Sequence, residues 1–185
     1  MTYHDRNEAQ IRSLQPGLRN LVRYGLYRAS RIGEDILIVQ GFRTQQEQNK
    51  ELAEGSSEVP YPYSFHNHGV AFDFVPVIFG TFAVKWAATS RYQKVANIFG
   101  TLGFEWGGVW TRLRDRPHLQ FRDGKTITDF INGYQVNGDH FKPMLEDAYA
   151  LEKQQLTNAL KFAKGARRAQ IRGEIRIVDD LIEML

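Results

Sequence analysis

The chain has 185 residues, a formal net charge of +3 and enough apolar sequence to build a core without disulfide staples. It contains no cysteine, which excludes disulfide frameworks, thiol nucleophiles and cysteine-ligated metal sites, so any metal must be held by His, Asp or Glu. No apolar run approaches the ~20 residues that span a bilayer. The polar N-terminal segment lacks the apolar core of a secretory signal, which predicts synthesis in the cytoplasm.

Three elements are predicted in the first third of the chain. Apolar residues at helical spacing predict a helix over 13–30, with Ser13 as its N-cap and Pro16 in its first turn. A run of branched apolar residues at 35–40 predicts a buried strand. Residues 44–53 carry the capping pattern of a second helix.

The middle of the chain alternates helices and strands irregularly. Residues 55–64 are rich in Gly, Ser and Pro and predict a loop. Strands are predicted at 70–75 and 119–121, a helix at 86–99, and a turn or loop in the Gly- and Trp-rich stretch 103–111. This order favours an α+β fold, with a small sheet flanked by helices, over a doubly wound fold.

The character of the sequence changes after about residue 140. Strand signals vanish, and the remainder is charged, helix-forming sequence with a break near Gly165. We therefore predict a catalytic-type core, 1–138, and a helical C-terminal tail, 139–185. The second part of this tail has one apolar stripe, made of Ile171, Ile175, Val178, Ile182 and Leu185.

The last helix carries its charges against its own dipole. Arginines fill its first half and acidic residues its second, although acidic groups are disfavoured near a helix C-terminus. This layout predicts that the acidic end meets a basic surface, either the Arg-rich helix 13–30 of the same chain or a second tail. Docking within one chain is preferred and leaves a monomer. The basic helices could instead contact an anionic envelope, or simply be solvated.

A first group of candidate functional residues stands in the segment SFHNHGVAFDF, residues 64–74. His66 lies just before a predicted strand, and Asp73 lies within that strand between two Phe residues. A buried carboxylate is costly unless it is paired or bound to a metal. Asp73 therefore either helps to bind a metal, points to the solvated face of an edge strand, or is hydrogen-bonded to the loop.

A second group stands in the segment DRPHLQF. Pro117 stiffens the turn and would fix His118 at the start of a strand. Together with His66 and Asp73, His118 gives two imidazoles and one carboxylate, which suffice for a catalytic zinc ion with a fourth position open to water. Asp115 would be a free carboxylate beside a ligand, able to pass a proton from the attacking water to a leaving amine.

Arg43 stands at a predicted strand-to-helix junction, in the sequence Gly-Phe-Arg-Thr. A guanidinium at this point could clamp a substrate carboxylate or stabilise an oxyanion. It could equally face solvent at the start of a helix.

Four segments, taken in order, resemble the zinc D-Ala-D-Ala carboxypeptidase/L-Ala-D-Glu endopeptidase family (VanY-like, peptidase M15), and most of all its phage L-alanyl-D-glutamate endolysins. The family pattern Ser-x-His-x-x-Gly-x-Ala-x-Asp occurs as SFHNHGVAFDF, and the acidic residue before Pro-His occurs in DRPHLQF. GFRT resembles a Gly-Tyr-Arg-Ser/Thr block, and residues 106–110 resemble a Trp-Gly-Gly-Asp-Trp block. The resemblance covers about residues 14–122 and implies a Hedgehog/DD-peptidase-like fold with a small antiparallel sheet.

The resemblance also implies roles for individual residues. It implies that His66, Asp73 and His118 are the zinc ligands. It further implies that Asp115 is the catalytic base and that Arg43 binds substrate or stabilises the oxyanion.

Substrate contacts are implied for Ser64, Trp106 and Trp110. The sequence departs from the family pattern at two positions. Val109 replaces the acidic residue of the Trp-Gly-Gly block. His68 offers a competing imidazole, although only the first histidine of its segment has the family spacing to the aspartate.

The resemblance therefore implies a peptidoglycan-degrading zinc endopeptidase, a phage endolysin that cleaves the L-Ala-D-Glu bond of the stem peptide. One alternative is a D-Ala-D-Ala carboxypeptidase of the same family. A second is a non-catalytic module that binds cell wall or nucleic acid. We expect a monomer with no nucleic-acid partner, made in the cytoplasm of the host bacterium and reaching the periplasm or cell wall after the membrane is permeabilised.

Overall fold

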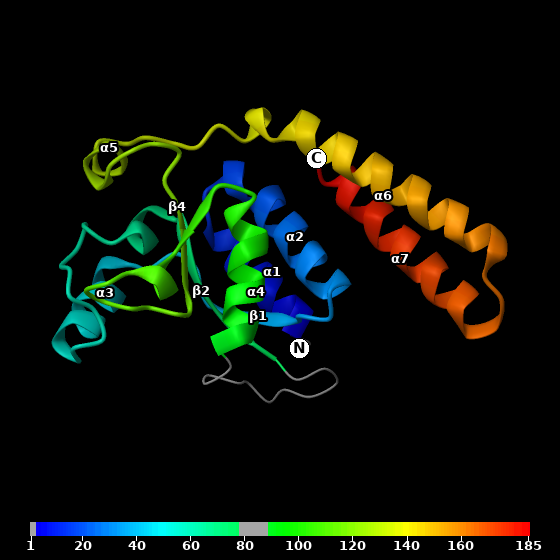
Figure 1. Cartoon of the computed structure of the whole chain (residues 1–185). Helices are drawn as coiled ribbons and strands as arrows, with labels where there is room; N and C mark the ends of the chain where they lie inside the picture. The colour runs from blue at the N-terminus through cyan, green and yellow to red at the C-terminus, as the bar shows by residue number, and fades with distance from the viewer. Residues whose placement is uncertain (1–2, 78–88) are drawn as a thin grey trace. The chain divides into compact units, whose positions relative to one another are not determined.

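The computed structural model of the chain describes residues 3–77 and 89–185. It forms two compact units, Met1–Val136 and Asn137–Leu185, which we call unit 1 and unit 2. Unit 1 holds the sheet and unit 2 is helical (Figure 1). The functional division predicted near residue 138 stays a prediction.

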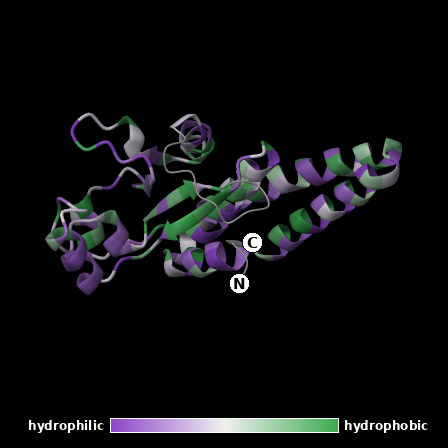
Figure 2. Cartoon of the chain, turned by 90° about the horizontal axis from the view of Figure 1, so that it is seen from below, coloured by the Kyte–Doolittle hydropathy of each residue, from purple (hydrophilic) through white to green (hydrophobic). Residues whose placement is uncertain are grey.

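Unit 1 is built around a four-stranded antiparallel sheet in the order β1-β2-β4-β3. In that order the strands are Ile36–Gln40, Ala71–Pro76, His118–Phe121 and Phe104–Trp106, and Figure 2 shows them among the most hydrophobic parts of the unit. The sheet and its helices confirm the predicted α+β class. The turn or loop predicted over 103–111 is wrong at Phe104–Trp106, which form β3. A strand of three residues is too short to show an alternating pattern in the sequence, and it forms here by pairing with β4.

The helices of unit 1 fall into two groups. Helix α2 (Pro16–Arg31) packs against both α1 (Tyr3–Ser13) and α4 (Thr89–Gly100), and all three contact the sheet. Two shorter helices, α3 (Gln45–Ala53) and α5 (Ile127–Ile131), lie in the connections.

The helix predicted over 13–30 is confirmed from Pro16, which lies in the first turn of α2 as predicted, but Ser13 is not its N-cap. Ser13 ends α1, a helix that was not predicted because its segment is polar nearly throughout. Its hydroxyl donates to the Gln10 carbonyl oxygen (2.6 Å) and accepts from the Phe42 N–H (3.0 Å), which ties α1 to the segment after β1. The N-cap position of α2 is occupied by Gln15, without a side-chain capping bond.

Two further helix predictions have different outcomes. The capping pattern of α3 is confirmed: the Thr44 hydroxyl accepts from the Glu47 N–H, and the Glu47 carboxylate accepts from the Thr44 N–H. The helix predicted at 86–99 is confirmed from Thr89 onward, and residues 86–88 lie outside the described ranges.

The two faces of β2 have opposite character. Phe72 and Phe74 pack against Phe99 and Tyr92 of α4, with ring centroids 5.3 and 5.2 Å apart. Because side chains alternate along a strand, Asp73 between them points to the opposite face. Asp73 therefore lies in an apolar stretch of sequence without lying in the apolar core.

The same alternation brings further polar residues to the face that Asp73 occupies. His118 and Gln120 alternate along β4 with core residues, and Glu105 of β3 is the cross-strand partner of Gln120. In β1 the register shifts between Ile38 and Gln40, so that Gln40 pairs with Asp73. This bulge turns Gln40 toward the polar face.

Unit 2 is a hairpin of two helices, α6 (Lys142–Phe162) and α7 (Gly165–Glu183), as the break near Gly165 predicted. The apolar stripe of α7 packs on α6 of its own unit, a covering partner that the sequence prediction did not consider. The acidic end of α7 forms an ion pair with α6, since Lys153 Nζ lies 2.6 Å from Asp179 Oδ1. The buried residues of this hairpin core are Leu145, Tyr149, Leu156, Ile171 and Val178.

No described helix is both long and apolar enough to cross a membrane.

An ion-pair cluster joins the start of β1 to α4. Glu34 is 5 % exposed, and its carboxylate lies 2.5 Å from Arg91 Nε and 2.9 Å from Lys94 Nζ. Burial opposes ionisation of Glu34, but the hydrogen bonds from Arg91 and Lys94 outweigh it and lower the pKa of the carboxyl.

We predict that Glu34→Gln lowers the free energy of unfolding by about 1–3 kcal/mol at pH 7, because a neutral amide replaces the buried carboxylate that accepts charge-assisted hydrogen bonds from Arg91 and Lys94. The stabilisation exists above the ordinary glutamate pKa of about 4.3 and is lost as pH falls through the lowered pKa of the folded state. Urea unfolding of both proteins at pH 7 and pH 3 measures the difference. As a control, Glu54→Gln removes an exposed pair with Lys50 and should cost under about 0.5 kcal/mol. An equal cost of Glu34→Gln at both pH values would contradict this account.

Candidate metal centre

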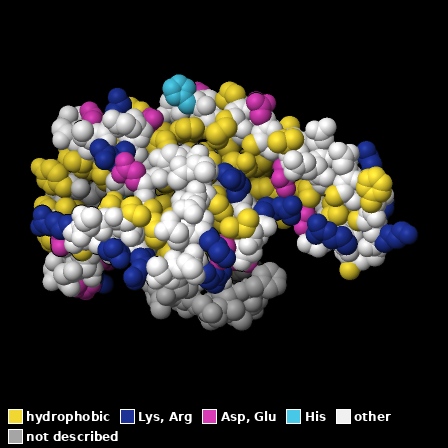
Figure 3. Space-filling model, in the orientation of Figure 1, with side chains coloured by type: hydrophobic (Ala, Val, Ile, Leu, Met, Phe, Trp, Pro, Cys, Tyr) yellow, Lys and Arg dark blue, Asp and Glu magenta, His cyan; other side chains and the backbone are white. Residues whose placement is uncertain are grey.

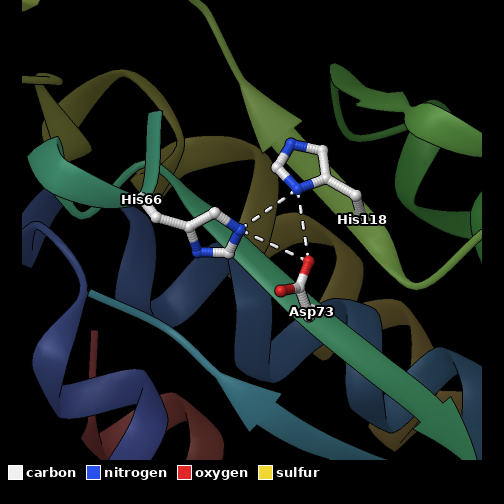
Figure 4. Close-up of side chains that lie close together, drawn as sticks. All are labelled: His66, Asp73 and His118. Carbon is white, nitrogen blue, oxygen red and sulfur yellow. Dashed lines mark hydrogen bonds and ion pairs between the residues drawn. The ribbon is translucent and has the colours of Figure 1, made fainter. Parts of the chain in front are cut away.

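His66, Asp73 and His118 converge on one point of unit 1 (Figure 4). His66 Nε2 lies 3.1 Å from His118 Nδ1 and 3.3 Å from Asp73 Oδ1, and His118 Nδ1 lies 3.2 Å from the same oxygen. Both histidines are buried. His66, Asp73 and His118 are the one group of His and acidic side chains among the described residues that lie close enough together to hold a metal ion.

The backbone explains why these three side chains meet. Asp73 and His118 are direct cross-strand partners of β2 and β4, on the same face of the sheet. His66 lies in a short 3₁₀ turn, Phe65–His68, just before β2. Gly69 ends this turn with a φ of 65°, a left-handed conformation that glycine adopts without strain, and so directs the chain back into the sheet.

Hydrogen bonds on the far side of each ring fix which nitrogen carries the proton. His66 Nδ1 lies 2.8 Å from the Gly41 carbonyl oxygen, which can only accept, so Nδ1 carries the hydrogen. His118 Nε2 lies 3.1 Å from the Gln120 side-chain oxygen, whose amide is oriented by donation to Glu105 (2.9 Å). When both rings are neutral, the two nitrogens that face one another, His66 Nε2 and His118 Nδ1, therefore carry no hydrogen and each presents a lone pair.

Two lone pairs and a carboxylate oxygen that converge in this way need a cation between them. Tetrahedral zinc with bonds of about 2.0–2.2 Å holds its ligand atoms about 3.3–3.6 Å apart. The three observed separations, 3.1–3.3 Å, are close to this spacing, so the residues fit such an ion. Burial opposes ionisation of Asp73, but His66 and His118 outweigh it and hold the pKa of the carboxyl well below its usual range.

Asp115 lies at the edge of this cluster, half-buried in the connection before β4. Its N–H donates to the Gly107 carbonyl (3.0 Å), and its carbonyl accepts from the His118 N–H (3.4 Å). Burial raises the pKa of the Asp115 carboxyl, and the negative charge of Asp73 raises it further. A carboxylate with a raised pKa is a stronger proton acceptor, which suits a base.

Gly107 makes this placement of Asp115 possible. A Cβ atom at Gly107 would lie 2.6 Å from the Asp115 carbonyl oxygen and 3.2 Å from the His118 Cβ. Any other residue would push the Asp115 loop away from the cluster.

Arg43 is buried, rather than facing solvent at a helix start. Its Nη2 lies 3.6 Å from Asp73 Oδ2, its Nε donates to the Gln40 side chain (2.9 Å) and its Nη1 to the Gln48 side chain (3.2 Å). The guanidinium therefore holds the carboxylate oxygen that points away from the histidines. Its predicted contact with substrate stays a prediction.

The other predicted residues lie around the cluster in different environments. The Trp110 ring lies 5.2 Å from the His118 ring and is half-exposed. Trp106 is buried and its indole N–H donates to the Arg116 carbonyl (2.7 Å), so its polar atom is already used. Ser64 is buried at the start of the His66 turn.

His68 and Val109, the two departures from the family pattern, both lie outside the cluster. His68 Nε2 bonds the Pro62 carbonyl (2.8 Å) and its ring lies beside Phe130. Val109 is 64 % exposed.

Sequence reasoning missed Gln120, Glu105 and Gln40, which orient the cluster. Gln120 could have been found, because it follows His118 by two residues in a predicted strand and so shares its face. The other two depend on β3 and on the β1 bulge, which leave no clear sequence signal.

Comparison with known proteins finds similar sequences around this cluster. Residues 58–121, which contain all three converging residues and Asp115, match a family model described as D-alanyl-D-alanine carboxypeptidase. The peptidoglycan L-alanyl-D-glutamate endopeptidase CwlK of Bacillus subtilis is 35 % identical over 106 residues, 50 % of this chain and 64 % of that protein. The L-alanyl-D-glutamate peptidase of Listeria phage A118 is 33 % identical over 143 residues, 76 % of this chain and 50 % of that protein.

A solved structure is also similar. The crystal structure of the Serratia marcescens L-Ala D-Glu endopeptidase ChiX matches with a TM-score of 0.55 and 28 % identity, over 68 % of this chain and 90 % of that one. The matches to the two curated relatives span less than two thirds of their length. The family model, the relatives and the solved structure agree with the motifs of the sequence, and the chain is similar to D-alanyl-D-alanine carboxypeptidases and to L-alanyl-D-glutamate endopeptidases.

Proposed function

We propose that the chain is a zinc endopeptidase that hydrolyses the L-Ala-D-Glu bond of peptidoglycan stem peptides. The observation that carries this proposal is the convergence of His66, Asp73 and His118 beside Asp115. The named activities of the Bacillus, Listeria phage and Serratia proteins support the choice of bond.

The chain's own residues divide the chemical work. A zinc ion held by His66, Asp73 and His118 would polarise the scissile carbonyl and lower the pKa of an attacking water toward ~7. Asp115 would accept the proton of that water on its carboxylate and deliver it to the leaving amine. Arg43 would orient Asp73 through the second carboxylate oxygen, and Trp110 offers a half-exposed aromatic ring beside His118.

The phage relative favours one biological setting. We propose that the protein acts as an endolysin, made in the host cytoplasm and reaching the wall once the membrane is permeabilised. Its substrate would then be the intact peptidoglycan of the host.

A D-Ala-D-Ala carboxypeptidase is the second candidate, favoured by the description of the matching family model. Mass spectrometry of purified peptidoglycan digested by the protein separates the two. We expect two kinds of fragment: one that ends in L-Ala, and one that begins with D-Glu. Release of free D-Ala alone would overturn the proposal in favour of the carboxypeptidase, and intact peptidoglycan in the presence of zinc would overturn both.

We predict one zinc ion per chain. The ion should be lost from His118→Ala, because the two remaining ligands bind zinc too weakly to retain it during dialysis. His68→Ala is the matched control and should retain it, since that ring bonds the Pro62 carbonyl instead. Metal analysis after dialysis measures the stoichiometry. Full zinc in His118→Ala would refute the assignment, and equal loss in both variants would place His68 among the ligands.

We predict that Gln120→Leu weakens zinc binding by about 10- to 100-fold, because His118 loses the acceptor that fixes its proton on Nε2. Competition with a chromophoric chelator gives the affinity. Gln93→Leu, on the exposed surface of α4, should leave the affinity unchanged. An unchanged affinity in Gln120→Leu would show that this hydrogen bond does not orient the ligand.

We predict that Asp115→Asn keeps zinc and fold but loses about 10²-fold or more in the rate of peptidoglycan cleavage, since the amide cannot take a proton. Asp139→Asn, an exposed aspartate in unit 2, should retain full activity. Cleavage rates at equal zinc occupancy measure the effect. Near-normal cleavage by Asp115→Asn would exclude Asp115 as the base.

A further inference from the structure

The helical hairpin of unit 2 is strongly polarised along its length. Residues 153–173, which surround the turn between α6 and α7, contain six Lys and Arg and no acidic residue. The acidic residues of α6 and α7 all lie outside this stretch, toward the open end of the hairpin. Figure 3 shows dark-blue side chains along the surface of this hairpin.

Local helix energetics do not account for this charge. Cations in the first half of α7 and acids in its last turn both oppose the helix dipole. One cation is explained structurally, since Arg168 Nη1 donates to the Leu160 and Ala163 carbonyls near the end of α6 (3.3 and 3.4 Å). A second, Arg167, lies 3.7 Å from Glu174.

Three other cations at the turn end have no acidic partner among the ion pairs of the described residues. Lys161 bonds only the neutral side chain of Asn158 (2.9 Å), and both Lys164 and Arg172 are exposed. Their charge is therefore available to an outside anion.

A large apolar side chain lies at the same end. Phe162, the last residue of α6, is 85 % exposed, the most exposed of the large hydrophobic residues described. It contributes little to the hairpin core, which is formed by other residues. An exposed aromatic ring next to unpaired cations is the chemistry of a segment that enters the interface of an anionic bilayer.

We propose that the turn end of the hairpin, centred on Phe162 with Lys161, Lys164 and Arg172, binds the surface of an anionic phospholipid membrane. The cations meet the lipid phosphates and the phenyl ring enters the boundary between headgroups and acyl chains. A nucleic-acid duplex would satisfy the cations, but its base faces are already stacked on one another and leave no apolar layer for a single protruding ring, which favours the lipid. This binding is independent of the peptidase reaction.

Flotation of the full chain with lipid vesicles tests the proposal. We expect binding to vesicles of phosphatidylcholine with about one third phosphatidylglycerol, little binding to pure phosphatidylcholine, and weakening with added salt. Equal binding to both compositions, or binding to duplex DNA but to neither vesicle, would overturn it.

Two pairs of variants locate the surface. Lys164→Ala with Arg172→Ala should lower the vesicle partition coefficient by about 30-fold, as expected for two cations at the surface. Arg6→Ala with Arg12→Ala removes two exposed cations of α1 and should have little effect. Both double variants should digest purified peptidoglycan at the unaltered rate. Equal weakening by both pairs would overturn the assignment to the hairpin turn.

The absence of cysteine allows a direct readout of the ring's position. Phe162→Cys and Leu151→Cys each introduce one site for an environment-sensitive fluorophore, the second at another exposed apolar position of α6. Anionic vesicles should shift the emission of the label at 162 to the blue and leave that at 151 nearly unchanged. No shift at 162 in vesicle-bound protein would overturn the insertion of this residue.

Discussion

Two imidazole lone pairs and a carboxylate oxygen converge within 3.1–3.3 Å in unit 1, and this arrangement is unfavourable without a cation. The proton positions are set from outside, by the Gly41 carbonyl behind one ring and by the Gln120 amide behind the other. The ligand atoms are therefore already oriented to bind a cation in the absence of a metal. Such preorganisation is what a metal site requires of the residues around its ligands.

The rest of unit 1 serves this convergence. The register of β2 and β4 places Asp73 opposite His118, and the alternation of side chains sends the neighbouring Phe residues into the core that fixes the sheet. The bulge in β1 delivers Gln40 to Arg43, which holds the second oxygen of Asp73. Gly107 lets the loop of Asp115 approach, so a residue with no functional atom of its own controls where the candidate base lies.

The sequence predicted the converging residues better than it predicted the elements that orient them. The segment around His66 and Asp73 and the segment at His118 carry strong patterns, and three of the strands follow from short apolar runs. By contrast, β3 has three residues and no internal periodicity, and α1 is polar nearly throughout, so both depend on tertiary packing. The apolar stripe of α7 was recognised, but α6 was not identified as the helix that covers it. Two adjacent helices joined by a short turn commonly form a hairpin and bury each other's apolar stripes.

X-ray absorption at the zinc edge, on protein purified with one equivalent of zinc, tests the central claim most directly. The account predicts a four-coordinate ion with two imidazoles, the remaining ligands being oxygen at about 2.0–2.2 Å. Three imidazoles would bring His68 into the site, and six oxygen ligands would show an ion bound elsewhere. Either result would contradict the assignment of His66, Asp73 and His118.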